Sequence, residues 1–218
     1  MSRTVYFTVS PRLTALLGEN YRQTEAALKE LVDNAWDADA GHVWVTLPQP
    51  MTSDPIIIRD DGHGMGPGEV ETEYLDIARD RRSIKGKYTP NGDRRVKGRK
   101  GIGKFAGLAA ARTMELVTVR DGICSQVSID KDAILNAPEN LEHIPLPMEE
   151  RPAPAAESGT TITLRDLDQA LNFPSAERLR ALLLYEYGRE PSITILVNGR
   201  ALDVEDFAGG DHYQAGQA

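Results

Sequence analysis

Apolar residues recur along this chain with two different periods, and each period predicts a different element. Helical spacing predicts one helix over 21–38, which Gly41 ends, and a second helix over 176–187. In other segments, apolar residues either alternate with polar ones or form β-branched runs, which is typical of strands. The apolar positions of the first helix are Leu28, Leu31, Val32 and Ala35.

The strand pattern appears in several short segments separated by turn residues. Asp121-Gly122 lies between two of them and predicts a hairpin. The expected strands are 5–9, 42–47, 55–58, 113–120, 123–129, 160–164 and 192–197. Together with the helices they predict an α/β fold, a two-layer sandwich in which a mixed β-sheet carries helices on one face.

The remaining segments predict shorter helices and loops. Helical turns are expected over 11–17, a helix over 67–78 behind Pro67, and a small apolar helix over 103–111. No apolar periodicity runs through 79–100, which predicts a long mobile loop. Pro, Ala and Glu dominate 138–158, which we interpret as a surface insertion.

Composition fits one soluble domain. The chain has 218 residues, of which 40% are hydrophobic and 27% charged, and its net charge of −8 is not that of a protein that coats nucleic acid. A single cysteine, Cys124, excludes an internal disulfide framework and favours a reducing compartment. The sequence has neither a signal-peptide core nor the roughly 20 apolar residues of a membrane span. We therefore expect a cytoplasmic protein without a membrane partner.

The first segment with candidate chemistry is the helix 21–38. Glu30, Asn34 and Asp37 stand at i, i+4 and i+7, so they share one stripe opposite the apolar positions. A carboxylate there can take a proton from water, and an amide oxygen suits Mg²⁺. The alternative is an ordinary solvated helix face.

The second segment is the turn that follows the β-branched run 56–58. Asp60 ends the strand, while Gly62 and Gly64 let the backbone approach a flat ligand closely. The carboxylate can accept a hydrogen bond from an exocyclic amine such as that of adenine, and Met65 offers a polarizable surface to a ring. A plain glycine turn is the alternative, whereas a Ca²⁺ loop would need more acidic residues.

The third segment, Gly98-Arg99-Lys100-Gly101-Ile102-Gly103, leads into the expected helix 103–111. Backbone N–H groups at such a junction bind phosphate. The spacing is neither that of a P-loop nor that of a dinucleotide fingerprint. Eleven Lys or Arg residues crowd 79–104. They could form a flexible lid over a polyphosphate, a nucleic-acid contact or a solvated loop.

Taken in order, these segments resemble the four boxes of the GHKL superfamily, which contains gyrase, heat-shock chaperones, histidine kinases and MutL. The nucleotide site of that superfamily is known as the Bergerat fold. The boxes correspond here to Glu30-x-x-x-Asn34, Asp60-x-Gly62-x-Gly64, Gly98-x-x-Gly101-x-Gly103 and Gly159-Thr160. Within that superfamily, the motifs resemble most those of bacterial chaperone-like or MORC-like ATPases.

The resemblance implies ATP and Mg²⁺ as cofactors and a role for each matched residue. Asn34 would hold the Mg²⁺ that bridges the phosphates, and Glu30 would orient and deprotonate the attacking water. Asp60 would bind the adenine amino group, supported through a water by Thr160. Gly101, Ile102 and Gly103 would give backbone N–H groups to the phosphates, and Asp37 and Ala38 would line the adenine side. The remaining expected nucleotide contacts are Gly62, Gly64, Met65, Gly98, Lys104 and Phe105.

The resemblance also predicts the domain plan. It implies an N-terminal strap over 1–20 that joins a nucleotide-dependent homodimer, and an ATP-binding domain over 21–205 with a lid at about 79–100. The sequence itself predicts a disordered tail over 206–218. Hydrolytic relatives complete their site with a Lys or Arg from a following domain. Because the sequence ends shortly after Asn198-Gly199-Arg200, we expect slow turnover in isolation.

Two other functions fit the same motifs. One is a protein kinase of the histidine-kinase type, although none of His42, His63, His143 and His212 lies in a recognisable helical dimerisation hairpin. The other is an ATP-regulated binding module without catalysis that contacts nucleic acid through the basic segment 79–104. The sequence does not identify the protein or DNA partner that the ATP cycle would serve.

Overall fold

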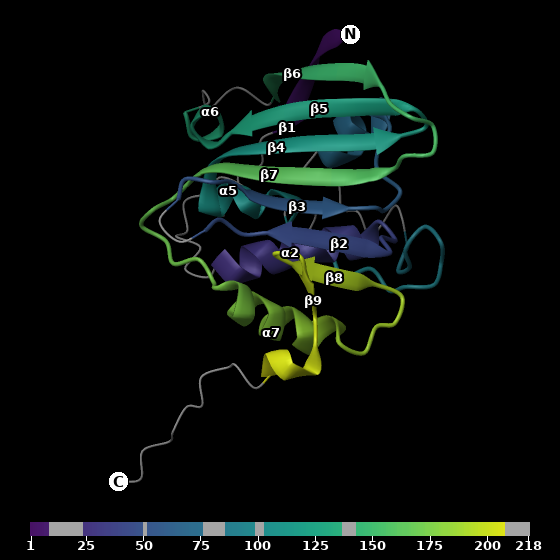
Figure 1. Cartoon of the computed structure of the whole chain (residues 1–218). Coiled ribbons are helices and arrows are strands. Elements are labelled where there is room, and N and C mark those ends of the chain that lie inside the picture. The colour runs from purple at the N-terminus through teal and green to yellow at the C-terminus, as the bar shows by residue number, and fades with distance from the viewer. Residues whose placement is uncertain (9–23, 50–51, 76–85, 99–102, 137–142, 208–218) are drawn as a thin grey trace.

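A computed structural model gives the fold of this chain and describes residues 1–8, 24–49, 52–75, 86–98, 103–136 and 143–207. Its strands form one nine-stranded sheet in the order β1-β6-β5-β4-β7-β3-β2-β8-β9 (Figure 1). Among the described strands only β2 and β8 pair in parallel, so the sheet is mixed as expected. The strands are β1 (Ser2–Thr8), β2 (His42–Thr46), β3 (Ile56–Asp60), β4 (Ala111–Arg120), β5 (Ile123–Asp130), β6 (His143–Pro152), β7 (Gly159–Leu167), β8 (Thr194–Val197) and β9 (Arg200–Ala201).

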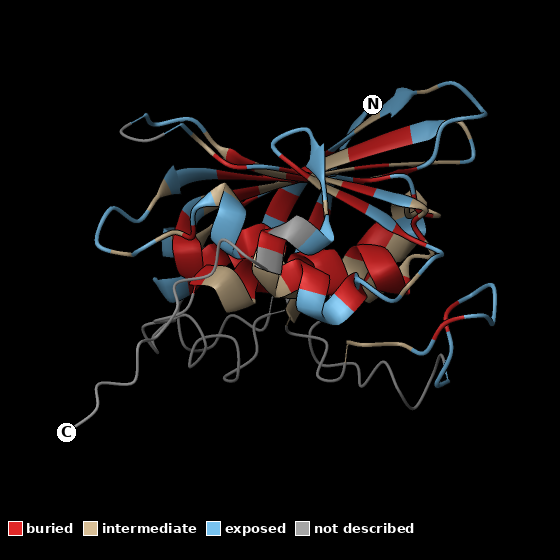
Figure 2. Ribbon diagram, turned by 60° about the horizontal axis from the view of Figure 1, so that its bottom comes forward, coloured by how far each residue is buried: buried red, intermediate tan, exposed pale blue. Residues whose placement is uncertain are grey.

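The helices lie on one face of this sheet, which confirms the two-layer sandwich (Figure 2). Two long helices dominate that layer, α2 (Thr24–Asp37) and α7 (Ala176–Tyr187). The shorter helical segments are α3 (Pro67–Glu69), η1 (Val70–Tyr74), η2 (Gly103–Phe105), α5 (Gly107–Ala110), α6 (Lys131–Leu135) and η3 (Val204–Phe207). No helix among the described residues is both long and apolar enough to cross a bilayer.

The core lies between the two layers and is built by the periodic positions of the sequence. Leu28, Val32 and Ala35 of α2 are buried against inward residues of the strands, such as Ile58 and Leu116. Burying such side chains contributes about 1.5–3 kcal/mol each. The apolar stripe thereby fixes the rotation of α2 and turns Glu30 and Asn34 to the half-buried flank.

One prediction from composition is wrong. The segment 138–158 contains β6, an interior strand, rather than a surface insertion. Its apolar alternation, Ile144, Leu146 and Met148, is interleaved with Pro145 and Pro147, which usually exclude a strand from a sheet interior. Over these prolines β6 pairs with β1 alone, since its pairing with β5 begins at Met148. The missing N–H groups can therefore face the unpaired side.

Two other segments differ from the prediction. The helix expected over 103–111 is a 3-10 turn, η2, followed by the single turn α5, and β4 already begins at Ala111. The loop expected over 79–100 is folded where the structure describes it, because Tyr88 and Arg95 form a bridge in a tight hairpin over 86–98. The turns expected over 11–17 lie outside the described residues.

Residues at both ends of the expected domain take part in the fold. The segment 1–8 belongs to the sheet, where Val5 and Phe7 of β1 are buried in the core. At the other end, folded structure continues beyond 205, because Asp206 is buried and forms an ion pair with Arg180 (2.9 Å). The tail from 208 lies outside the described residues.

Candidate nucleotide site

Three of the motif segments meet at one end of the sheet. Asp60 ends β3 and Gly159 begins β7, and because these strands are antiparallel neighbours the two ends lie side by side (Figure 1). The C-terminal end of α2 reaches the same place, where a Cβ added to Gly62 would lie 2.6 Å from the carbonyl oxygen of Ala38. The close packing explains why position 62 requires glycine.

Asp60 is the best-defined polar group of this end. Its side chain is almost fully buried, and its Oδ1 accepts hydrogen bonds from the backbone N–H groups of Gly62 (2.9 Å) and Thr160 (3.2 Å). Among the described residues none donates to its Oδ2. Burial raises the pKa of Asp60 to about 6, against the two backbone hydrogen bonds, which lower it. The second oxygen is therefore available to an external donor.

Gly64 brings the second box against the fourth. Its backbone is left-handed, with φ +62°, and an added Cβ would run into the carbonyl of Val119 and lie 3.1 Å from the nitrogen of Gly159. Met65 follows, and its side chain packs against the core. Asp60, Gly159 and Thr160 also line one hollow at this end of the sheet, together with Arg59, Val117, Val119, Glu157, Ser158 and Thr161.

Sequence reasoning missed Thr118, which ties these segments together. Its hydroxyl accepts a hydrogen bond from the N–H of Met65 (2.9 Å), donates to the carbonyl of Gly159 (3.2 Å) and lies 3.2 Å from Oγ1 of Thr160. Thr118 is fully buried. The available signal was a polar residue that continues the inward apolar series of Met114 and Leu116 in β4.

The polar stripe of α2 is divided by burial. Glu30 and Asn34 are half-buried, and the carboxylate of Glu30 lies against Gly103, where an added Cβ would be 3.1 Å from Cδ of Glu30. No described side chain or backbone group hydrogen-bonds to the amide of Asn34. The first and third boxes are thus in contact. The amide of Asn34, to which no described group hydrogen-bonds, lies one turn further along the same helix.

Asp37 is placed differently from these two residues. Its side chain is buried, and its oxygens accept hydrogen bonds from the backbone N–H groups of Lys97 (2.8 Å) and Gly98 (2.9 Å). Asp37 therefore holds the start of the glycine-rich segment. Ala38, the next residue, contacts the turn of the second box, because its carbonyl accepts from the N–H of His63 (3.0 Å).

Comparison with known proteins supports the nucleotide interpretation. Residues 21–160 match the family model described as histidine kinase-, DNA gyrase B- and HSP90-like ATPases. The chain belongs to this ATPase family. ATP binding is implied by the family, and the four boxes found in the sequence fall within the matched residues or at their end.

One relative of this ATPase domain is described as a putative type II restriction enzyme, HgiDII, from Herpetosiphon aurantiacus. The two sequences are 34% identical over 151 residues, which is 65% of this chain. The chain spans about a fifth of the length of that relative, 22%.

The remaining candidate residues of the ATPase domain, from 101 to 105, differ in their surroundings. Phe105 is fully buried between Phe7 and Tyr74, with ring centroids 5.1 and 5.4 Å away, so its side chain belongs to the core and only its backbone can face a ligand. Lys104 donates to the carbonyl of Glu73 (2.6 Å). Gly101 and Ile102 lie outside the described residues.

Two cations of the basic segment 79–104 contact the folded domain. Arg94 is buried, donates to the carbonyls of Ala40 (2.8 Å) and Ser192 (2.5 Å), and stacks on Trp36. Lys97 lies 3.8 Å from the ring centroid of Tyr187 and 3.3 Å from Glu186. These two cations therefore dock the hairpin 86–98 on α2 and α7. Arg79, Arg81, Arg82, Lys85, Arg99 and Lys100 lie outside the described residues.

Metal binding by protein side chains alone is not indicated. The described residues contain no group of three or more His, Cys, Asp or Glu side chains that could hold an ion. A magnesium ion at Asn34 would instead depend on phosphate oxygens and water, the usual coordination of Mg²⁺ in nucleotide sites.

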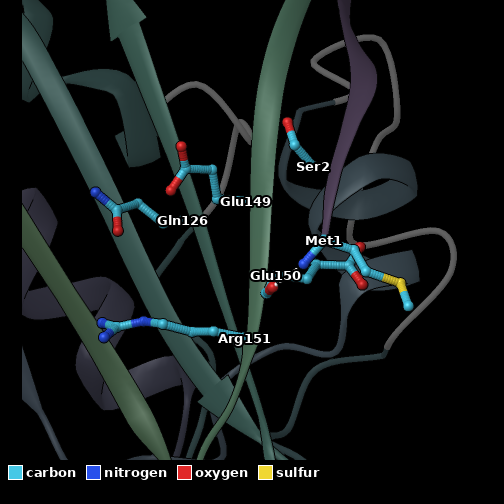
Figure 3. Close-up of a pocket in the computed structure, with 6 residues that line it drawn as sticks. All are labelled: Met1, Ser2, Gln126, Glu149, Glu150 and Arg151. Carbon is cyan, nitrogen blue, oxygen red and sulfur yellow. Dashed lines mark hydrogen bonds between the residues drawn. The ribbon is translucent and has the colours of Figure 1, made fainter.

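A second hollow lies near β1, the first strand of the sheet order. Met1, Ser2, Gln126, Glu149, Glu150 and Arg151 line it (Figure 3). The carboxylate of Glu150, which lines it, accepts a hydrogen bond from Nε of Arg3 (2.7 Å). It contains none of the motif residues, which separates it from the nucleotide site.

Proposed function

We propose that this domain binds ATP together with Mg²⁺ and hydrolyses it, slowly when the domain is alone. The observation that carries the proposal is the buried carboxylate of Asp60, one oxygen of which is held by backbone while no described residue donates to the other. An amine donor from a ligand would satisfy it, as the adenine amino group does in the family's pattern.

The adenine end of the site would be built by backbone and small residues. Gly62 and Gly64 let the turn pack closely, Ala38 and Met65 offer apolar surface, and Thr160 supports Asp60 through its N–H. Thr118 would act as a positioning residue, because its hydroxyl links the backbone of Met65 to that of Gly159. This end would select adenine through one charged acceptor, the carboxylate of Asp60, in a surface that is otherwise largely apolar.

The phosphate end would lie along α2. Asn34 would coordinate Mg²⁺ through its amide oxygen, and the ion would neutralise phosphate charge. Glu30 would orient the attacking water and accept its proton, and its contact with Gly103 of the glycine-rich segment supports this role. Lys104 and the backbone from Gly98 to Gly103 would contribute further phosphate contacts.

Turnover would be slow because phosphoryl transfer depends on charge stabilisation at the phosphates. We infer that a Lys or Arg outside the described site completes it in the hydrolytic state. Such cations contribute about 10³–10⁵-fold to the rate in other nucleotide hydrolases.

We also infer that ATP promotes a homodimer. β1 is the end strand of the sheet, so its outer edge has no partner among the described residues. An edge strand can pair with a second chain, which gives the N-terminal segment 1–20 its candidate role as a strap. A non-hydrolysable ATP analogue should shift the molecular mass toward the dimer at micromolar protein concentration.

The test of the proposed function separates binding from chemistry. Calorimetric titration with ATP and Mg²⁺ should show saturable binding, and single-turnover assays should show slow hydrolysis. Glu30→Ala should retain ATP affinity within about threefold while hydrolysis falls by about 10²–10⁴-fold. Absence of ATP binding by the unaltered protein would refute the proposal, as would hydrolysis that survives the substitution.

The relative's description suggests a setting for this ATPase. Restriction enzymes cut DNA, so we propose that ATP turnover here serves a protein that acts on DNA. Exposed cations of the hairpin, Lys87 and Arg95, are candidates for backbone contacts. The ATPase rate should then rise on addition of duplex DNA at low salt, and a rate unchanged by DNA would contradict this setting.

A further inference from the structure

We infer that Asp37 is a positioning residue for the phosphate-binding segment and does not read the adenine ring. The family pattern places this residue on the adenine side, but the contacts of its carboxylate point elsewhere. The inference rests on the proposed ATP site and assigns one of its carboxylates a different task.

The first observation is the geometry of the carboxylate. Oδ1 of Asp37 accepts from the N–H of Lys97 at 2.8 Å, and Oδ2 accepts from the N–H of Gly98 at 2.9 Å. The residue is only 2% exposed. Charge-assisted hydrogen bonds of this kind are about twice as strong as neutral ones, so the two N–H groups are held firmly.

The second observation is the shape of Gly98. A Cβ at this position would lie 2.8 Å from Oδ2 of Asp37, well inside contact distance. Glycine is therefore required here so that the backbone can reach the carboxylate, quite apart from any requirement of a bound phosphate.

The third observation is that neighbouring residues dock the same hairpin. Trp36 donates from Nε1 to the carbonyl of Arg95 (3.0 Å), and Arg94 donates to the carbonyl of Ala40 (2.8 Å). The carboxylate of Asp39 accepts from the N–H of Asn91 (2.9 Å). The C-terminal end of α2 is thus the base on which the hairpin 86–98 is built.

Both described ends of the glycine-rich segment consequently lie against α2. Asp37 holds Gly98, and Glu30 lies against Gly103. The two carboxylates are seven residues apart, which is about 10 Å along a helix, and Asn34 lies between them. One rigid helix thereby sets the proposed water-activating carboxylate, the magnesium-binding amide and the ends of the phosphate-binding segment relative to one another.

This role predicts a difference between ligands with and without phosphates. Asp37→Asn keeps one acceptor but turns an NH₂ group toward the other backbone N–H, which breaks half of the clamp. Affinity for ATP with Mg²⁺ should fall about tenfold or more, while affinity for adenosine should stay within twofold. A residue that lined the adenine would lower both affinities equally.

The matched control is Asp39→Asn. Asp39 lies two residues further along, in the turn that follows α2, and its carboxylate contacts the same hairpin. Its φ of +57° suits asparagine. The variant removes the same charge without touching Gly98, so both affinities should stay within twofold of the original. An equal loss of ATP affinity in this control would assign the effect to charge and overturn the inference.

A second variant keeps the inference testable if Asp37→Asn does not fold, as judged by thermal unfolding. Gly98→Ala disturbs the same contact from the hairpin, since its Cβ would lie 2.8 Å from Oδ2 of Asp37, and it should also weaken binding of ATP but not of adenosine. Equal losses for both ligands, or no loss for either, would overturn the inference while leaving ATP binding by the unaltered protein in place. Failure of the unaltered protein to bind ATP would instead overturn the proposed function and the inference with it.

Discussion

Two buried aspartates at the same end of the molecule differ in how their oxygens are used. Asp60 binds two backbone N–H groups through one oxygen, and among the described residues none donates to the other. Asp37 uses each oxygen for a backbone N–H of the hairpin end. The difference teaches that a buried carboxylate signals a ligand only when part of its hydrogen-bonding capacity is left over.

The two regions also differ in what they hold together. Around Asp60, strands β3, β4 and β7 converge through glycines and the hydroxyl of Thr118. Around Asp37, a helix end carries a hairpin through a buried Arg94 and a stacked Trp36. The first region is part of the sheet, whereas in the second a hairpin docks on the C-terminal end of a helix.

The largest expected effect tests the tight packing of the Asp60 region. Gly64→Ala would force a Cβ into the carbonyl of Val119 at a left-handed backbone position, φ +62°. We expect a loss of about 3 kcal/mol or more in the free energy of unfolding, measured by chemical denaturation.

The control for this prediction is Gly92→Ala in the hairpin. Gly92 has a similar left-handed φ of +81°, but an added Cβ would meet nothing within 4 Å. Only the backbone cost of about 1 kcal/mol should appear. Equal losses at the two positions would mean that the close approach in the Asp60 region has no energetic weight.

The next effect is the pH dependence of stability caused by Asp60. Burial raises its pKa in the folded state to about 6, above an unfolded value of about 3.9. Between these values the folded state binds more protons than the unfolded state, so stability falls as pH rises from about 4 to about 6. The loss should reach about 2–3 kcal/mol at most.

Asp60→Asn isolates this contribution, since the amide does not titrate. Denaturation of both proteins between pH 4 and 7 should show the difference in unfolding free energy changing in favour of the variant as pH rises. A difference that does not vary with pH would mean that the carboxylate titrates normally and is better solvated than its burial indicates.

Much of the fold could be predicted from apolar periodicity. The helix 176–187 and the hairpin at Asp121-Gly122 were placed correctly, because one buried face imposes a clear period on each. The strand β6 could not be predicted, since its prolines mask the alternation and its pairing with β1 is distant in sequence. Tertiary pairing, not local propensity, decides that segment.

Motifs predict candidate residues for the site, but they do not predict the contacts that these residues make. The four boxes gave Glu30, Asn34, Asp60 and Thr160. Helical periodicity placed Asp37 on the same face of the helix as Glu30 and Asn34. It did not reveal that a backbone N–H group of the hairpin would donate to its carboxylate. Thr118 carried no motif, so only its burial among apolar neighbours distinguishes it.

A third effect sharpens the contrast between the aspartates in binding. Asp60→Asn replaces the acceptor for the proposed amine donor with an amide that can present its own NH₂ group. Adenosine and ATP should both bind about 10–100-fold more weakly, in proportion to one lost charge-assisted hydrogen bond. Calorimetry with both ligands measures this, and a selective loss of ATP affinity would exchange the roles assigned to Asp60 and Asp37.

The smallest effect separates side chain from backbone at the hairpin end. Lys97 contacts Tyr187, Trp36 and Glu186 through its ammonium, but it is the N–H of Lys97 that binds Asp37. Lys97→Ala removes the cation–π contacts and the half-exposed ion pair, which should cost about 0.5–1 kcal/mol of stability. Because the N–H remains, affinity for ATP should change less than twofold. A tenfold loss of ATP affinity in this variant would show that the ammonium itself reaches the phosphates, and the backbone clamp would then be secondary.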